Sequence, residues 1–266
     1  MSILPWHRDK MIGFDIESTG TDVFNDRIIT ASVVYVAGVL RPKTYNWVIN
    51  PGIEIPDEAA AVHGWTTERL NAHPAAMDPD TAVFEILGVL ARSMVHGIPL
   101  VAMNAAFDLT MLETEADRYD IDTLGSRLPN GIRPVIDPMV LDKQVDPWRP
   151  GKCDGHQKRA PRCTCGAQGK KLVDLCLHYG VLLGDAHTAD ADATAACRLV
   201  TRLVERKTVL QGYDLEQLHD AQVGWRIGQQ DSLAAYFDKQ GTVHDGCCGE
   251  WPVHSSCAPA RQAVSA

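Results

Sequence analysis

The sequence predicts a mixed α/β fold built around a single sheet. Three segments between residues 11 and 50 have strand-like composition and are joined by short turns, which favours an antiparallel meander. Further along the chain, short apolar segments alternate with segments whose apolar residues recur at helical spacing. Consecutive strands followed by alternating strands and helices are typical of a sheet covered by helices.

The first half of the chain contains the clearest strands. Residues 11–17 (MIGFDIE) form an apolar run, and residues 27–36 (RIITASVVYV) are rich in β-branched side chains. Residues 44–50 (TYNWVIN) alternate between polar and apolar and stop at Pro51-Gly52. We expect three consecutive strands here.

The second half is predicted to be mostly helical. Two short apolar strands are expected at residues 98–102 and 134–136. Helices are expected at residues 79–95, 104–119, 171–179 and 188–210, followed by an amphipathic helix over 213–239. We therefore expect one domain over residues 1–210, then a C-terminal helix and a tail rich in Cys and His at 211–266.

Composition restricts the class of protein. With 266 residues and 45% hydrophobic content, the chain can bury one core of ordinary size. It lacks an apolar run near the ~20 residues that span a bilayer, and residues 1–10 lack the apolar centre of a signal peptide. We expect a soluble, cytoplasmic protein with no membrane partner.

The charge is unevenly distributed. The formal net charge is −9, yet residues 149–171 contain seven Lys or Arg and one Asp, so this segment is +6 and the remainder is −15. A local basic stretch can attract a polyanion even when the whole chain is acidic. A solvated loop explains the same composition, and both interpretations stay open.

Two motifs place acidic residues at the end of a predicted strand or in the helix that follows one. Asp15 and Glu17 are two residues apart in a strand, so their side chains share a face and can hold one cation. Asp108 is expected in the first turn of a helix, where Asn104 is a natural N-cap and Phe107 faces the core. Taken alone, Asp-x-Glu is usually a solvated strand end, and the second motif fits an ordinary capped helix.

A third motif begins at His187. Asp190 and Asp192 follow it in the first turns of a predicted helix. Alone, the histidine is typical of a helix cap and the two acids of a solvated helix face that favours the helix dipole.

Together, the three motifs resemble those of the DnaQ-like DEDDh exonucleases, which read D-x-E, N-x-x-F-D and H-x-A-x-x-D. Residues 50–65 (NPGIEIPDEAAAVHGW) are similar to the family's segment after the third strand, with Trp65 where the family has Ile. The resemblance extends over about residues 10–207. It implies a ribonuclease H-like fold with a five-stranded mixed sheet flanked by helices.

The resemblance also implies an activity. It suggests a metal-dependent 3′–5′ exonuclease similar to the DNA polymerase III epsilon subunit, acting on single-stranded DNA or a frayed 3′ end. Two Mg²⁺ or Mn²⁺ ions, which prefer carboxylate oxygen, would lie between four acids and clamp the attacking and leaving oxygens. Those acids would be Asp15, Glu17, Asp108 and Asp192, with Asp15 shared by both ions. His187 would act as the general base, because an ordinary His pKa of about 6.5 suits that role.

Residues near the terminal nucleotide follow from the same resemblance. The predicted substrate-binding residues are Ser18, Thr19, Glu58, His63, Asn104 and Phe107.

Cysteine and histidine form two further groups. Cys153, His156, Cys163 and Cys165 could form a structural Zn²⁺ site in the basic segment, or belong to a reduced loop. The tail holds a second set that could form another cluster or none: His244, Cys247, Cys248, His254 and Cys257. Cys176 and Cys197, which lie among apolar helical residues, are expected to be core positions.

Partners are less defined by the sequence. Gln230-x-x-Leu233-x-x-Tyr236-Phe237 matches a sliding-clamp-binding pattern, although any amphipathic helix can show this spacing. A polymerase is the other partner that the resemblance implies.

Three functions compete. The first is a DNA 3′–5′ exonuclease in proofreading or repair, which residues 50–65 favour. The second is an exoribonuclease with the same chemistry. The third is a non-catalytic nucleic-acid-binding adaptor of a replisome, against which the complete set of four acids and a histidine argues, although fold alone would not exclude it.

Overall fold

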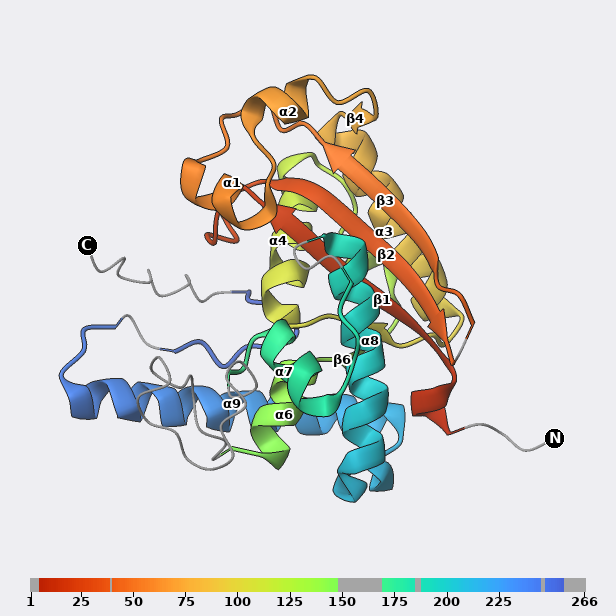
Figure 1. Cartoon of the computed structure of the whole chain (residues 1–266), viewed down its shortest axis with the longest axis vertical. Coiled ribbons are helices and arrows are strands. Elements are labelled where there is room, and N and C mark those ends of the chain that lie inside the picture. Colours follow the sequence, from red (N-terminus) through yellow and green to blue (C-terminus); the bar gives the residue numbers. More distant parts are fainter. Residues whose placement is uncertain (1–4, 39, 148–168, 185–187, 245–246, 256–266) are drawn as a thin grey trace.

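The computed structural model describes residues 5–38, 40–147, 169–184, 188–244 and 247–255. Within these ranges, one sheet with the strand order β4-β3-β2-β1-β5-β6 forms the centre (Figure 1). The strands are β1 (Lys10–Ser18), β2 (Ile28–Ala37), β3 (Lys43–Ile49), β4 (Ala76–Met77), β5 (Leu100–Val101) and β6 (Val135–Ile136).

The three long strands form the expected antiparallel meander. β1 pairs with β2 and β2 with β3, both antiparallel, whereas β5 and β6 add on the other side of β1 in parallel. The expectation of five strands was wrong, because Ala76 and Met77 pair with Val48 and Ile49 of β3 as a sixth. A two-residue strand has no periodicity that the sequence could reveal.

Helices cover both faces of the sheet. The side chains of Ile12, Phe14 and Ile16 lie in a core cluster with residues of α3 (Pro79–Val95) and α4 (Ala105–Arg118). Met11, on the other face of β1, packs in a second cluster with α7 (Leu172–Tyr179) and α8 (Ala189–Arg206). Because side chains alternate along a strand, the face of Met11 is also that of Gly13, Asp15 and Glu17. The sheet therefore presents both acids of the first motif to the α8 side.

Shorter elements complete the described fold. They are η1 (Trp6–Arg8), α1 (Asp57–His63), α2 (Thr67–Asn71), α5 (Leu124–Arg127), α6 (Pro138–Val145), η2 (Thr208–Gly212) and α9 (Leu215–Gln240). The predicted helix over residues 188–210 ends earlier, at Arg206, since Lys207 leaves the helical conformation at φ −117° and ψ 84°. Leu210, which continues the apolar spacing, is buried within η2 instead.

Helix α8 approaches β1 most closely at Gly13. A Cβ atom at this position would overlap the backbone carbonyl oxygen of Ala193 and lie 3.0 Å from Sγ of Cys197. A residue without a side chain is therefore needed for α8 to pack this close to the strand.

Helix α9 covers the β6 edge of the sheet. Nδ1 of His219 accepts a hydrogen bond from the backbone N–H of Val135 (3.1 Å), and Nε2 of Gln222 donates to the carbonyl of Val135 (3.0 Å). The backbone groups of an edge strand need such partners when they are buried. α9 thus packs directly on the sheet, and the predicted division near residue 210 stays a prediction.

None of the helices in the described residues is long and apolar enough to cross a membrane.

Candidate active site

Three carboxylates from two elements converge beside the C-terminal end of β1. Asp15 and Glu17 belong to β1, and Asp192 lies in the first turn of α8. One oxygen from each of the three lies within 4.8 Å of the others, and all three residues are partly buried. Alternation along β1 and the close packing of α8 at Gly13 together produce this geometry.

Burial and the neighbouring acids raise the pKa values of Asp15 and Glu17. Burial, followed by the charges of Asp108, Asp192 and Glu17, holds the pKa of Asp15 well above its usual range. Burial and the Asp192 charge raise the pKa of Glu17 to about 7. Like charges that share a partly desolvated site disfavour the ionised forms, and a bound cation would relieve this repulsion.

Asp108 is attached to the same strand by a hydrogen bond. Its Oδ1 accepts from the backbone N–H of Ile16 at 3.2 Å, and the residue is 4% exposed. Burial raises the pKa of Asp108, while hydrogen bonds from the backbone N–H groups of Ile16 and of Asp108 itself oppose the shift. Asp108 is therefore close to the carboxylate cluster without belonging to its 4.8 Å group.

The beginning of α4 differs from the expectation. Asn104 was predicted to cap the helix, but it adopts the left-handed conformation (φ 64°, ψ 48°) and its side chain forms no capping hydrogen bond. The buried carboxylate of Asp137 accepts instead from the backbone N–H groups of Asn104 (3.1 Å) and Ala105 (3.0 Å). Asp137 also accepts from the N–H of Met139 at 2.8 Å, so one carboxylate joins the starts of α4 and α6.

Asp137 was not among the predicted site residues. Its signal was the Asp-Pro pair after the predicted strand at 134–136, a common beginning of a helix. The contact with Asn104 joins residues 33 positions apart, which no local pattern reveals.

Ser18 and Thr19 are turned into the β1–β2 connection. The Ser18 hydroxyl donates to the carbonyl of Gly20 (2.6 Å), and the Thr19 hydroxyl donates to Asp26 (3.0 Å). Both residues are buried, at 9% and 2% exposure. Their side chains stabilise this turn, and their predicted contact with substrate stays a prediction.

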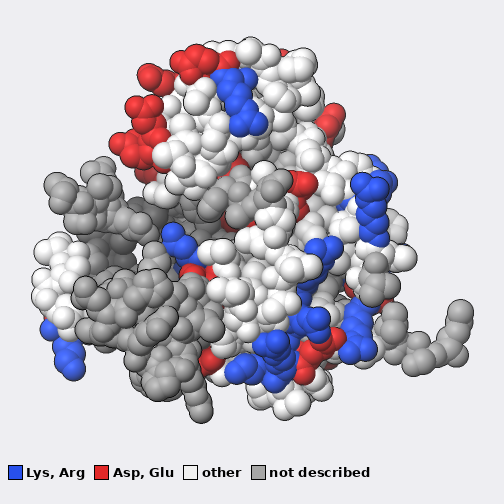
Figure 2. Space-filling view, viewed as in Figure 1, with Lys and Arg blue, Asp and Glu red and all other residues white. Residues whose placement is uncertain are grey.

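The other predicted substrate-binding residues occupy varied environments. Glu58 is exposed in α1, in a region where Figure 2 shows acidic side chains gathered over α1 and α2. His63 is buried, and its Nδ1 accepts from the backbone N–H of Trp65 at 3.1 Å. Phe107 is partly buried against the core.

The Trp65 ring contacts one cationic and one aromatic side chain. The Arg69 guanidinium lies 3.9 Å from its ring centroid, and the His73 ring contacts its edge with centroids 5.3 Å apart. An indole packed against these two side chains thus stands where the family resemblance led us to expect an isoleucine.

Several predicted residues lie outside the described ranges. These are His187, most of the basic segment, and the four predicted zinc ligands Cys153, His156, Cys163 and Cys165. Within the described ranges, Cys176 and Cys197 are buried free thiols, which confirms them as core positions. Burial raises the pKa of Cys176 to about 11. The clamp-like pattern lies within α9, where Leu233 is 39% and Tyr236 is 57% exposed.

The carboxylate cluster fits a hard divalent cation. Asp15 and Glu17 form no ion pair with any residue in the described part of the chain, although both are partly buried. Carboxylate oxygens gathered beside the end of β1 are the ligands that Mg²⁺ and Mn²⁺ prefer.

The chain is similar in sequence to known exonucleases and to subunits of DNA polymerase III. The family model RNase_T, described as an exonuclease, matches residues 12–200. The chain is 24% identical to the DNA polymerase III epsilon subunit of Treponema pallidum over 202 residues, covering 75% of this chain and 79% of that protein. It is 27% identical to an uncharacterised exonuclease of Escherichia phage 186 over 201 residues, covering 75% and 89%.

Other relatives are much longer. A PolC-type DNA polymerase III of Lacticaseibacillus paracasei is 23% identical over 227 residues. The match covers 85% of this chain but only 13% of that protein. Among solved structures, exonuclease I of Methylocaldum szegediense superposes with a TM-score of 0.57 at 20% identity, covering 77% of this chain and 42% of the other. Exonuclease I of Escherichia coli in complex with a dT13 oligonucleotide gives 0.59 at 14% identity, covering 77% and 43%.

Proposed function

Since the chain belongs to the RNase_T exonuclease family, we propose that it removes nucleotides one at a time from the 3′ end of DNA. The observation that carries this proposal is the convergence of Asp15, Glu17 and Asp192, with Asp108 attached beside them. An adaptor has no need for four acids that repel one another at one end of a strand. The repulsion is useful in a site that binds cations.

Two divalent cations would be held by these four acids. Asp15, Glu17 and Asp192 form the ligand set for one ion, and Asp15 and Asp108 for the other, as the family resemblance implies. Bound there, such ions supply a nucleophile at neutral pH and compensate charge on the attacking and leaving oxygens.

The remaining roles belong to the chain itself. His187 is proposed to take the proton from the attacking water, since an imidazole can accept a proton near neutral pH. Asp137 holds the beginning of α4 and so positions Asp108. The predicted contacts of Ser18, Thr19, Glu58, His63, Asn104 and Phe107 would hold the terminal nucleotide.

The choice of DNA rests on the resemblance of residues 50–65 and on the relatives named for DNA polymerase III. Exonuclease I, whose fold is similar, is a protein solved with DNA oligonucleotides. A role in proofreading or repair, alongside a polymerase or a sliding clamp, extends the same proposal.

The test is degradation of DNA and RNA oligonucleotides labelled at the 3′ or the 5′ end, with Mg²⁺, Mn²⁺ or chelator. The proposal expects immediate release of the 3′ label, a ladder from the 5′-labelled strand, and no reaction in chelator. Faster degradation of RNA would favour the exoribonuclease, and binding without degradation under every metal condition would favour the adaptor.

A further inference from the structure

The C-terminal segment 247–255 folds back onto the body of the protein. Trp251 is 6% exposed, and its ring contacts that of His219 in α9 with centroids 5.0 Å apart. The backbone N–H of His254 donates to Oγ1 of Thr110 in α4 at 2.8 Å. These contacts fix the segment against two helices.

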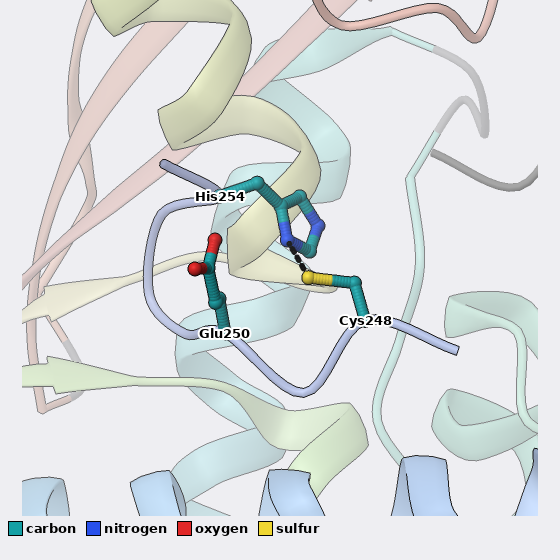
Figure 3. A group of neighbouring side chains, drawn as sticks. All are labelled: Cys248, Glu250 and His254. Carbon is teal, nitrogen blue, oxygen red and sulfur yellow. Dashed lines mark hydrogen bonds between the residues drawn. The ribbon is translucent and has the colours of Figure 1, made fainter. Parts of the chain in front are cut away.

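Three side chains of this segment turn toward one another (Figure 3). They are Cys248, Glu250 and His254, and one ligand atom from each lies within 4.8 Å of the others. Sγ of Cys248 and Nδ1 of His254 are 3.1 Å apart. The Glu250 carboxylate accepts from the backbone N–H of Ser255 at 2.6 Å and from its hydroxyl at 3.1 Å, which orients it.

We propose that Cys248, Glu250 and His254 form a Zn²⁺ site in the reduced chain. Zn²⁺ binds thiolate, imidazole and carboxylate ligands together, whereas Mg²⁺ takes oxygen donors. Cys248 is disulfide-bonded in this structure, so the site forms only after a thiol or phosphine reductant delivers two electrons to that bond and is itself oxidised. The bond then separates into two thiols, and the Cys248 thiol loses its proton when it binds Zn²⁺. The three residues supply three ligands of a tetrahedral site, in which water can occupy the fourth position.

The surroundings of His254 favour its neutral form. Burial lowers the pKa of His254, as does the Arg226 charge, while Glu250 opposes them. The imidazole is therefore neutral over a wider pH range, as coordination requires.

The site is separate from the carboxylate cluster, but α4 connects the two. Thr110, which holds His254, lies two residues after Asp108 in the same helix. Zinc at this position would attach the C-terminal segment to the helix that carries Asp108. The inference stands whether or not the chain proves to be a nuclease.

Cobalt substitution tests the site without any measurement of activity. The full-length chain is stripped of metal by chelator, kept in a phosphine reductant and excess Mg²⁺, and titrated with Co²⁺. We expect a thiolate-to-cobalt charge-transfer band that saturates with bound Co²⁺ and is abolished by Zn²⁺. Oxygen-ligated Co²⁺ at the carboxylate cluster gives no such band.

Variants assign the band to individual side chains. Cys248→Ser should lower the number of thiolate-bound Co²⁺ ions per chain by one. Co²⁺ bound at any other cysteine site of the chain would be unaffected, so the loss assigns the band to Cys248. His254→Gln should weaken the same equivalent by at least about tenfold, because the imidazole is a direct ligand. Cys247→Ser, at the neighbouring free thiol, is the control and should bind as the wild type does.

Three results would overturn the proposal. They are absence of the band in the reduced wild type, an unchanged number of equivalents in Cys248→Ser, and alkylation showing that Cys248 stays oxidised in the reductant. Circular dichroism checks the fold of each variant. If Cys248→Ser fails to fold, unchanged affinity in His254→Gln would reject the site equally.

Discussion

The backbone N–H of Ile16 donates to Oδ1 of Asp108, although the two residues are 92 positions apart. Ile16 lies between Asp15 and Glu17, so this bond joins the second acidic motif to the first. Asp108→Asn keeps an oxygen that can accept this bond and removes only the charge. We expect exonuclease activity to fall by at least about 100-fold, since a lost metal ligand costs several kcal/mol of transition-state stabilisation. Thermal denaturation in chelator should show a melting temperature no lower than that of the wild type, and a lower one would mean that the substitution damaged the fold.

Asp190 and Asp192 give a matched pair within one helix. Asp192 belongs to the carboxylate cluster and Asp190 does not, although both lie in the first turn of α8. Asp192→Asn should abolish detectable degradation of a 5′-labelled strand, whereas Asp190→Asn should stay within about threefold of the wild type, because Asp190 is outside the carboxylate cluster and such changes usually cost less than about 0.5 kcal/mol of stability. Equal losses in the two variants would assign the effect to the helix dipole, not to metal binding.

The pKa of Glu17 predicts how stability depends on pH. Folding raises it from an ordinary 4.5 to about 7, so the folded state binds a proton that the unfolded state has released. In chelator, this contribution is complete below about pH 4.5 and is lost as the pH rises through about 7. At pH 8, Glu17→Gln should therefore be more stable than the wild type, by up to about 3 kcal/mol. Denaturant unfolding at pH 5.5 and pH 8 measures the difference, and a Glu17→Gln gain that does not grow with pH would contradict the assignment.

Asp137 should be needed for both stability and catalysis. Asp137→Ala leaves the backbone N–H groups of Asn104, Ala105 and Met139 without their acceptor. Each buried unsatisfied group costs about 1–3 kcal/mol, so we expect a total loss of at least about 3 kcal/mol. Differential scanning calorimetry measures it, with Asp146→Ala at the other end of α6 as the control. A melting temperature equal to that of the control would exclude the positioning role.

The basic segment is expected to supply affinity for nucleic acid. Replacing Lys158, Arg159 and Arg162 with Ala should weaken binding of long single strands. Each lost phosphate contact should reduce the slope of log K against log salt by about 0.7. Fluorescence anisotropy over a salt series measures the slope, while cleavage of a dinucleotide should change little. An unchanged slope would leave the segment as a solvated insertion.

The sequence predicted the long elements of the fold and the acids that they carry. Residues 27–36 and 79–95 have strong local patterns, and the spacing of Asp15 and Glu17 fixes their common face. Local rules failed where distant residues decide the conformation. Asn104 was predicted to cap α4 because Asn often does so, but it adopts a left-handed conformation and its side chain forms no capping bond. The Asp137 carboxylate, which is distant in the sequence, instead accepts from the backbone N–H groups of Asn104 and Ala105. β4 is defined only by the pairing of Ala76 and Met77 with the end of β3, which no local pattern reveals.

Gly13 has a consequence for how variation in this chain should be interpreted. It carries no chemical group, yet a single methyl at this position would push against Ala193, the residue next to Asp192. A search for functional positions that considers only reactive or charged side chains would therefore not select Gly13. When every position is substituted in turn, Gly13 should tolerate other residues as poorly as the acids do, because any side chain at this position would force β1 and α8 apart.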